Sequence, residues 1–144
     1  MRILVQRVNS AKVEINEKTI SEIKEGLVLF VGFTQTDNIE NIKYLIQKVL
    51  NLRIFPDELN IMNKSILDYG GEILSVSQFT LYADTKKGNR PSYTKALKSS
   101  EAKILYDEFN NELKKYISVK TGVFGADMEV KISNVGPTTI LLER

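Results

Sequence analysis

The sequence contains no cysteine, no histidine and no tryptophan among its 144 residues. Without cysteine and histidine, it has no thiolate nucleophile, no Ser-His or Cys-His pair and no ligands for the common zinc sites. It also has no disulfide framework, so the simplest expected compartment is the cytoplasm. An enzyme built from these residues must rely on positioning, on backbone donors or on groups that the substrate brings.

Long apolar runs and a strong net charge are also missing. The longest apolar run, Gly26–Phe33, is far too short to span a membrane, and the alternating N-terminus does not resemble a signal peptide. The net charge is only +2, so a polyanionic partner would have to meet a local cluster of cations. No pair of acidic residues has the spacing of a carboxylate metal site, and we expect neither a metal nor another cofactor.

The composition predicts one folded domain that spans residues 1–144. Hydrophobic residues make up 42% of the chain and charged residues 26%, which is ordinary for a globular protein. The apolar patterns predict about seven strands and about two helices. We therefore expect a single α/β domain with a curved, mostly antiparallel or mixed, barrel-like sheet and two packed helices. The predicted strands are Met1–Val8, Ala11–Asn16, Gly26–Phe33, Leu52–Phe55, Glu72–Ala83, Val119–Ser133 and Pro137–Arg144.

Both predicted helices have recognisable start signals. Asp37 and Glu40 have the spacing of a capping box before the first helix. Ser99 or Ser100 is a suitable N-cap for the second. The polar segment Asp57–Gly71 is expected to be a loop that holds at most a short strand. The apolar stripe of the second helix is read as Ala102, Leu105, Phe109, Leu113 and Tyr116.

Small polar side chains fill the end of the predicted strand Glu72–Ala83. If the strand continues, Ser77 and Phe79 lie on one face, and Gln78 and Thr80 on the other. A face open to solvent would account for these polar residues without any function. Alternatively, the strand end lines a pocket in which backbone N–H groups and polar side chains hold a carbonyl group. Thr80 is an unattractive nucleophile, because neither an N-terminal amine nor a histidine can activate it.

A Gly-Pro pair, Gly136–Pro137, begins the last predicted strand. The ordinary explanation is a tight turn between two strands, because glycine permits unusual dihedral angles and proline fixes its own. The sequence leaves both the cis and the trans form of the bond open. In the cis form the two carbonyl groups could point the same way and form a rigid wall without side chains, which would suit discrimination between enantiomers.

Two further segments carry weaker signals. Gly122 and Gly125 flank Phe124 and predict a bulge or a close backbone approach, although Phe124 and Met128 are of types that more often belong to a core. The connection of residues 86–98 is usually the kind of segment that forms a solvated loop, but it could also track phosphates, with Tyr93 available to stack on a base. Its cations are Lys86, Lys87, Arg90, Lys95 and Lys98, and it holds no acidic residue.

Taken together, these segments resemble one family, the D-aminoacyl-tRNA deacylases of the D-tyrosyl-tRNA deacylase type. The resemblance runs from Met1 to Leu142, and its one departure is Thr138, where the family motif NxGPVT has valine. The motifs that occur in the family's order and spacing are QRV, GLVLFVG, LRIF, VSQFTLYAD, KGNRPSY, TGVFGADM and NVGPTTI.

The resemblance implies hydrolysis of the ester that joins a D-amino acid to the terminal adenosine of a tRNA, with glycyl-tRNA as a further substrate. It implies proofreading in cytoplasmic translation quality control by a homodimer that needs no cofactor. The 2′-OH of the terminal ribose would assist the chemistry, and the protein would position and polarise the ester. Each subunit's Gly-cis-Pro turn would reach into the partner's pocket and exclude an L side chain.

The resemblance also implies roles for particular residues. Ser77, Gln78, Phe79 and Thr80 would line the ester pocket, with the Phe79 backbone N–H near the scissile carbonyl. The other roles concern the chiral turn, the adenine and the tRNA phosphates. The chiral turn would be formed by Gly136, Pro137 and Asn134 and braced by Arg7. The adenine would contact Phe124 and Met128. The tRNA phosphates would contact Lys86, Lys87 and Arg90.

Two other functions stay open on the residues alone. The missing general base favours a non-catalytic module that binds tRNA or other RNA ends through the cations of residues 86–98. The third hypothesis is a hydrolase of another ester with Thr80 as its nucleophile.

Overall fold

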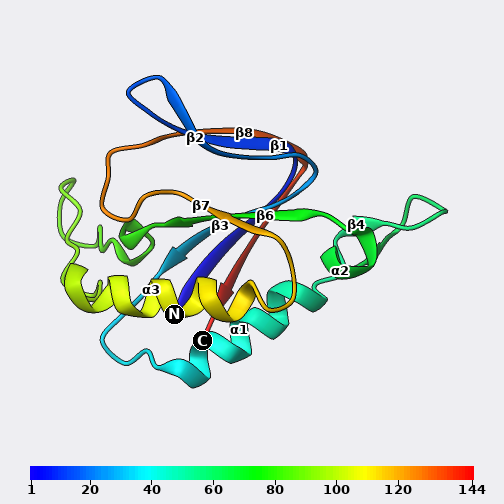
Figure 1. Ribbon diagram of the computed structural model, residues 1–144. Helices are drawn as coiled ribbons and strands as arrows, with labels where there is room; N and C mark the ends of the chain where they lie inside the picture. Colours follow the sequence, from blue (N-terminus) through cyan, green and yellow to red (C-terminus); the bar gives the residue numbers. More distant parts are fainter.

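A strongly curved, mixed β-sheet forms the centre of the computed structural model, which describes residues 1–144 (Figure 1). The elements in chain order are β1 (Arg2–Ile15), β2 (Lys18–Ile23), β3 (Gly26–Gly32), α1 (Ile39–Asn51), β4 (Phe55–Pro56), β5 (Met62–Lys64), α2 (Ile66–Tyr69), β6 (Glu72–Ser77), the 3₁₀ helix η1 (Phe79–Tyr82), α3 (Ser99–Leu113), β7 (Val119–Thr121) and β8 (Glu129–Glu143). The main sheet has the order β2-β1-β3-β6-β7, and β8 also pairs with β1. The predicted α/β domain with a curved, mixed sheet is confirmed.

Strand directions change across the sheet at β3. β1 runs antiparallel to β2, β3 and β8, whereas β6 runs parallel to β3 and to β7. β3 is therefore a central strand, and six of its seven residues are buried. That burial explains its continuous apolar sequence, because a strand covered on both faces needs no alternation.

Two long helices, α1 and α3, lie next to each other against one face of the sheet (Figure 1). Their apolar stripes bury the main core against β1 and β3, and each fully buried aliphatic side chain there contributes about 1.5–3 kcal/mol. No helix of the protein combines the length and the apolar character needed to cross a membrane. The buried stripe of α1 has spacings of three and four, with Ile42, Leu45, Ile46, Val49 and Leu50.

The predicted capping box of α1 is wrong by one residue. Asn38 is the N-cap, its side chain accepts the backbone N–H of Glu40 and Asn41, and the Asn41 side chain accepts the Asn38 N–H. Asp37 is engaged elsewhere, because its buried carboxylate pairs with the amino group of Met1. A contact across the fold thus removes Asp37 from the local capping pattern.

The second helix and the segment before β6 also differ from expectation. α3 begins after Lys98 without any side-chain cap, so neither Ser99 nor Ser100 serves as the predicted N-cap. The segment Asp57–Gly71, predicted as a loop, contains β5 and the single-turn helix α2. Ser65 caps α2 in a capping box with Asp68, a local signal that the sequence prediction missed.

The remaining corrections concern the strands. The predicted strand Leu52–Phe55 is wrong except for Phe55, which begins β4, and β2 was not predicted. The two predicted N-terminal strands are one continuous strand, β1. β6 stops at Ser77, and residues Phe79–Tyr82 form η1, so the predicted alternation of faces beyond Ser77 is wrong. The ladder ends there because the last parallel pair joins Ser77 to Val31, one residue before β3 itself ends. The predicted strand Val119–Ser133 is divided by a loop of residues 122–128.

Candidate active site

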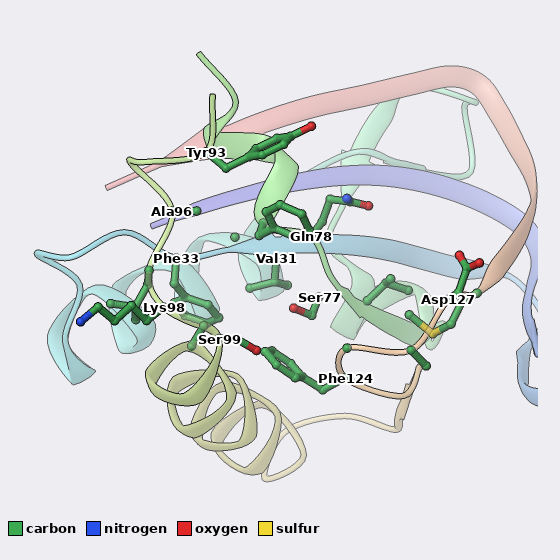
Figure 2. A pocket seen from close by; sticks show the side chains of 18 of the residues that line it. Val31, Phe33, Ser77, Gln78, Tyr93, Ala96, Lys98, Ser99, Phe124 and Asp127 are labelled. Atoms are coloured by element: carbon green, nitrogen blue, oxygen red, sulfur yellow. The ribbon is translucent and has the colours of Figure 1, made fainter. Parts of the chain in front are cut away.

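A cavity of about 620 Å³ opens where the chain leaves β6 and where residues 122–128 leave β7 (Figure 2). The first turn of α3 and the segment that precedes it close the cavity on a third side. Twelve of its nineteen lining residues are hydrophobic. Mostly apolar walls with a few polar groups are typical of sites for small ligands.

The first wall is formed by the end of β6 and the start of η1, and it contains three of the predicted pocket residues. Ser77, Gln78 and Phe79 all line the cavity. The Gln78 backbone N–H donates to the Val31 carbonyl at 2.8 Å, which anchors the turn to β3. Thr80 does not line the cavity, and its hydroxyl accepts a hydrogen bond of 2.5 Å from Gln78 Nε2. Thr80 therefore contacts the cavity residue Gln78 from outside the cavity, as its hydrogen-bond partner.

The opposite wall is the loop of residues 122–128. Phe124 and Met128, for which the family resemblance implies contact with the adenosine, both line the cavity here. The loop folds back tightly, since the Val123 N–H contacts Met128 Sδ at 3.3 Å. A Cβ atom on Gly122 would lie only 2.8 Å from the same sulfur, so a larger residue there would displace the Met128 side chain. The structure thus brings the two predicted groups, 47 residues apart from Ser77 to Phe124, into one cavity.

Two partly exposed aromatic rings line the cavity, and cations lie on the chain segment around one of them, Tyr93. Phe79 and Tyr93 meet edge to face with 4.9 Å between ring centroids, and they remain 54% and 40% exposed. The Lys95 ammonium pairs with Asp84 at 2.8 Å and, through this contact first, lowers the pKa of that carboxyl group. The three predicted phosphate contacts are exposed on the neighbouring loop and do not line the cavity; they are Lys86, Lys87 and Arg90.

The Gly-Pro pair lies outside the cavity, in a bulge of β8. β1 and β8 pair at Gln6 with Thr139 and again at Val8 with Asn134, so residues 135–138 stand opposite Arg7 alone. The Gly136–Pro137 bond is cis, and both residues are exposed. None of the predicted chiral-selection residues lines the cavity. The four are Gly136, Pro137, Asn134 and Arg7.

Side chains from β1 and β8 hold this bulge. Asn134 Nδ2 donates to the Arg7 carbonyl at 2.9 Å and to the Thr138 carbonyl at 3.1 Å. Arg7 Nη1 donates to the Ile54 carbonyl at 2.5 Å, and Nη2 lies 3.5 Å from the Val135 carbonyl. Arg7 therefore ties the bulge to the segment before β4, and Asn134 spans its base.

Gly136 is the tightest position in the bulge. Its φ is +111°, a region that residues with a side chain rarely adopt. A Cβ atom there would lie 2.8 Å from the Thr138 nitrogen and 3.2 Å from Arg7 Nη2. The backbone conformation and the close neighbours at this position therefore leave no room for a side chain.

One residue behind the cavity was missed. Tyr106 is buried on α3, and its ring packs against Phe124 with 5.7 Å between centroids. Burial raises the pKa of its hydroxyl. The predicted stripe replaced Tyr106 with Leu105 and ended on Tyr116, which is exposed. The spacing of four, three and four from Ala102 to Leu113 through Tyr106 would have found it.

The chemistry available in the cavity is that of amide, hydroxyl and backbone groups. No three His, Cys, Asp or Glu side chains come together in the way that metal ligation requires. Gln78, Ser77 and Ser99 supply neutral donors and acceptors, and Lys98 and Asp127 lie along the lining. Such a site can bind, orient and polarise a carbonyl compound.

Comparison with known proteins gives consistent results. A family described as D-Tyr-tRNA(Tyr) deacylase matches residues 4–143. A D-aminoacyl-tRNA deacylase of Clostridium botulinum is 54% identical over 144 residues, covering 99% of this chain and 97% of that protein. The solved structure of a c-Myc DNA unwinding element binding protein is similar with a TM-score of 0.96 and 39% identity, covering 100% and 99% of the two chains. A probable eukaryotic D-amino acid tRNA deacylase shares the fold, with a TM-score of 0.86 and 17% identity over 98% of this chain and 97% of that one.

Proposed function

The chain belongs to the D-Tyr-tRNA(Tyr) deacylase family and is a hydrolase of the aminoacyl-tRNA ester bond, and from this premise we propose that it removes D-amino acids from tRNA while rejecting L-aminoacyl-tRNA. The observation that carries the proposal is the cavity in which the β6 end faces Phe124 and Met128. An aminoacyl-adenosine has a flat aromatic base, which can stack on aromatic side chains, at one end and a reactive ester at the other. The two walls match these two ends.

In this proposal the cavity acts by positioning and polarisation. The Phe79 backbone N–H and Gln78 orient the scissile carbonyl, and one well-placed oxyanion donor is worth about 2.7–4 kcal/mol of barrier. The ester is already activated, and the 2′-OH of the terminal ribose supplies the neighbouring hydroxyl. Thr80 acts through Gln78, whose side-chain amide it holds at 2.5 Å.

We further propose that the chiral filter comes from a second subunit. Gly136 and Pro137 are exposed, lie outside the cavity and are held rigidly by Arg7 and Asn134. In a homodimer, the bulge of one subunit would enter the partner's cavity and present backbone carbonyls to the α-amino group. A rigid backbone wall would reject an L side chain by steric conflict.

The same filter suggests two additional substrate features. Glycine has no side chain for the wall to reject, which supports glycyl-tRNA as a further substrate in translation quality control in the cytoplasm. The rest of the tRNA would meet the loop beside the cavity mouth, where three exposed cations are available to the phosphates. These are Lys86, Lys87 and Arg90.

The deciding experiment compares hydrolysis of D-Tyr-tRNA and L-Tyr-tRNA by the purified protein, with and without EDTA. We expect rapid loss of the D ester, persistence of the L ester and no effect of EDTA. Equal cleavage of both esters would contradict the proposed filter, and cleavage of neither by folded dimer would contradict the activity.

A binding function is the second candidate, because the structure with 39% identity carries the name of a DNA unwinding element binding protein. The cations beside the cavity mouth are compatible with it. Multiple turnover of D-Tyr-tRNA would reject a purely binding role. Stoichiometric binding of single-stranded DNA or RNA ends without turnover would support it.

A further inference from the structure

The two chain segments that form the cavity walls run side by side up to Ser75 and diverge beyond its carbonyl group. The parallel pairing of β6 and β7 ends at Ser75 and Thr121. Beyond that pair, β6 continues to Ser77 and the other chain turns into the loop that carries Phe124. The Gly122 N–H donates to the Ser75 carbonyl at 3.0 Å and is the last backbone link between the two walls.

A second donor reaches the same carbonyl from the helix behind it. The Tyr106 hydroxyl donates to the Ser75 carbonyl at 2.9 Å and lies 3.3 Å from Ser75 Oγ, which donates to it. Tyr106 and Ser75 are both buried, with exposed fractions of 3% and 0%. A hydrogen bond formed without competition from water is strongly directional and costly to leave unmade. This bond therefore fixes the position of the end of β6 relative to α3.

Tyr106 also contacts the other wall. Its ring packs on Phe124 at 5.7 Å, and Asn110 Nδ2 donates to the Tyr106 carbonyl at 2.8 Å one turn further along α3. One side chain thus bonds to the strand that leads to Ser77 and packs on a residue of the opposite loop. No other hydrogen-bonded side chain of α3 joins β6 in this way.

We propose that Tyr106 is a positioning residue. It sets the distance and angle between the cavity wall that contains Ser77, Gln78 and Phe79 (the ester wall) and the wall that contains Phe124 and Met128 (the adenosine wall). This inference rests on the proposed function and adds a residue that does not itself line the cavity. The binding and reaction of a substrate that contacts both walls depend on the spacing between them. The affinity of a ligand that contacts only the Phe124 wall does not. The two kinds of ligand therefore separate positioning from a general loss of structure.

The test is Tyr106→Phe, which removes the hydroxyl and keeps the ring against Phe124. We expect kcat for D-Tyr-tRNA to fall about tenfold, the effect of losing about one hydrogen bond. The Kd of adenosine monophosphate, which reaches only the Phe124 wall, should change less than about twofold because the ring contact remains. The affinity for a non-hydrolysable amide analogue of 3′-D-tyrosyl-adenosine, which spans both walls, should fall with kcat.

Two controls isolate the hydroxyl-to-carbonyl bond. Ser75→Ala removes only the 3.3 Å side-chain contact and should stay near wild-type kcat. Tyr69→Phe removes a hydroxyl that donates to Glu25 outside the cavity and should likewise leave kcat unchanged. A tenfold loss in either control, or a parallel loss of adenosine monophosphate binding in Tyr106→Phe, would overturn the proposal.

Replacement of Tyr106 by 4-aminophenylalanine provides the rescue, because its amine can donate to the Ser75 carbonyl. We expect kcat close to that of the wild type, and this variant gives the answer if Tyr106→Phe does not fold. A folded rescue variant with the tenfold defect, or wild-type kcat in folded Tyr106→Phe, would overturn the proposal. If wild-type protein itself does not hydrolyse D-Tyr-tRNA, the proposed function fails first, and the two failures are thereby distinguished.

Discussion

The β6 end and the β8 bulge are both polar interruptions of apolar strands, but the fold treats them differently. The β6 end lies against β3 and faces Phe124 across a cavity. The bulge at Gly136 and Pro137 is exposed, and the cavity-lining residues do not include it. The first region thus faces a surface that belongs to the same chain. The second is a rigid projection whose proposed surface is supplied by another subunit.

Gly136→Ala should give the largest effect, because it breaks the projection and leaves the cavity intact. The new Cβ would meet the Thr138 nitrogen at 2.8 Å and force a positive φ on alanine. A displacement of the bulge by about 1 Å would lower kcat/KM for D-Tyr-tRNA about 100-fold. The measurement is kcat/KM, with binding of adenosine monophosphate as the control for an intact cavity. An active Gly136→Ala enzyme that still rejects the L ester would show that the bulge is not the filter.

Mixed dimers would sharpen the comparison by placing the two regions on different chains. One chain carries Gln78→Ala and the other Gly136→Ala. If each site combines one chain's cavity with its partner's bulge, the mixed dimer has one intact site and should regain about half of wild-type kcat per dimer.

The matched control places both substitutions on one chain and pairs it with a wild-type chain. In that dimer both sites are damaged, so activity should stay near that of the single variants. The reverse outcome, recovery in the control and none in the first mixture, would place the whole site within one chain. Tagged copurification followed by single-turnover assay measures both dimers.

The elements that depend on local pattern were predictable. β3 follows from a continuous apolar run because it is buried almost throughout, and α1 follows from spacings of three and four because one face of the helix is buried along its length. The end of β6 was not predictable from its own residues. Its strand-like residues continue as far as Ala83, whereas its pairing with β3 ends at Ser77 and Val31.

The candidate site divides in the same way. The motifs identified Ser77, Gln78, Phe124 and Met128, but their meeting in one cavity depends on the parallel pairing of β6 and β7. The helical spacing of α3 could have placed Tyr106 in the core, but no local pattern encodes its contacts with Ser75 and Phe124. The roles of these residues in catalysis and binding stay predictions, and the variants of Gln78 and Tyr106 described above test two of them.

Thr80→Ala should have a smaller effect, because Thr80 supports the β6 wall without lining the cavity. The substitution removes one exposed hydrogen bond to Gln78 Nε2, and we expect kcat for D-Tyr-tRNA to fall by no more than about fivefold. Single-turnover kinetics with a search for an acyl-enzyme measures this. A folded, substrate-binding Thr80→Ala protein without any activity, or a trapped acyl-threonine in the wild type, would make Thr80 the nucleophile instead.

The smallest effect on activity is expected from Glu14→Gln, at the end of the β1–β8 ladder away from the bulge. Glu14 Oε1 and Oε2 each lie 2.6 Å from an ammonium, those of Lys12 and Lys131. The hydrogen bond from Lys12, followed by that from Lys131, lowers the pKa of Glu14 from 4.5 to about 2. The pKa is lower in the folded state, so the stabilisation is present above pH 4.5 and is lost as the pH falls toward 2.

The urea midpoint of the wild type should therefore exceed that of Glu14→Gln at pH 7, and the difference should shrink between pH 4.5 and pH 2. Deacylation by Glu14→Gln at pH 7 should stay within about twofold of wild type, because sites that share no partners act independently. A large loss of activity would mean that the whole β1–β8 ladder, and not only Arg7 and Asn134, sets the position of the bulge.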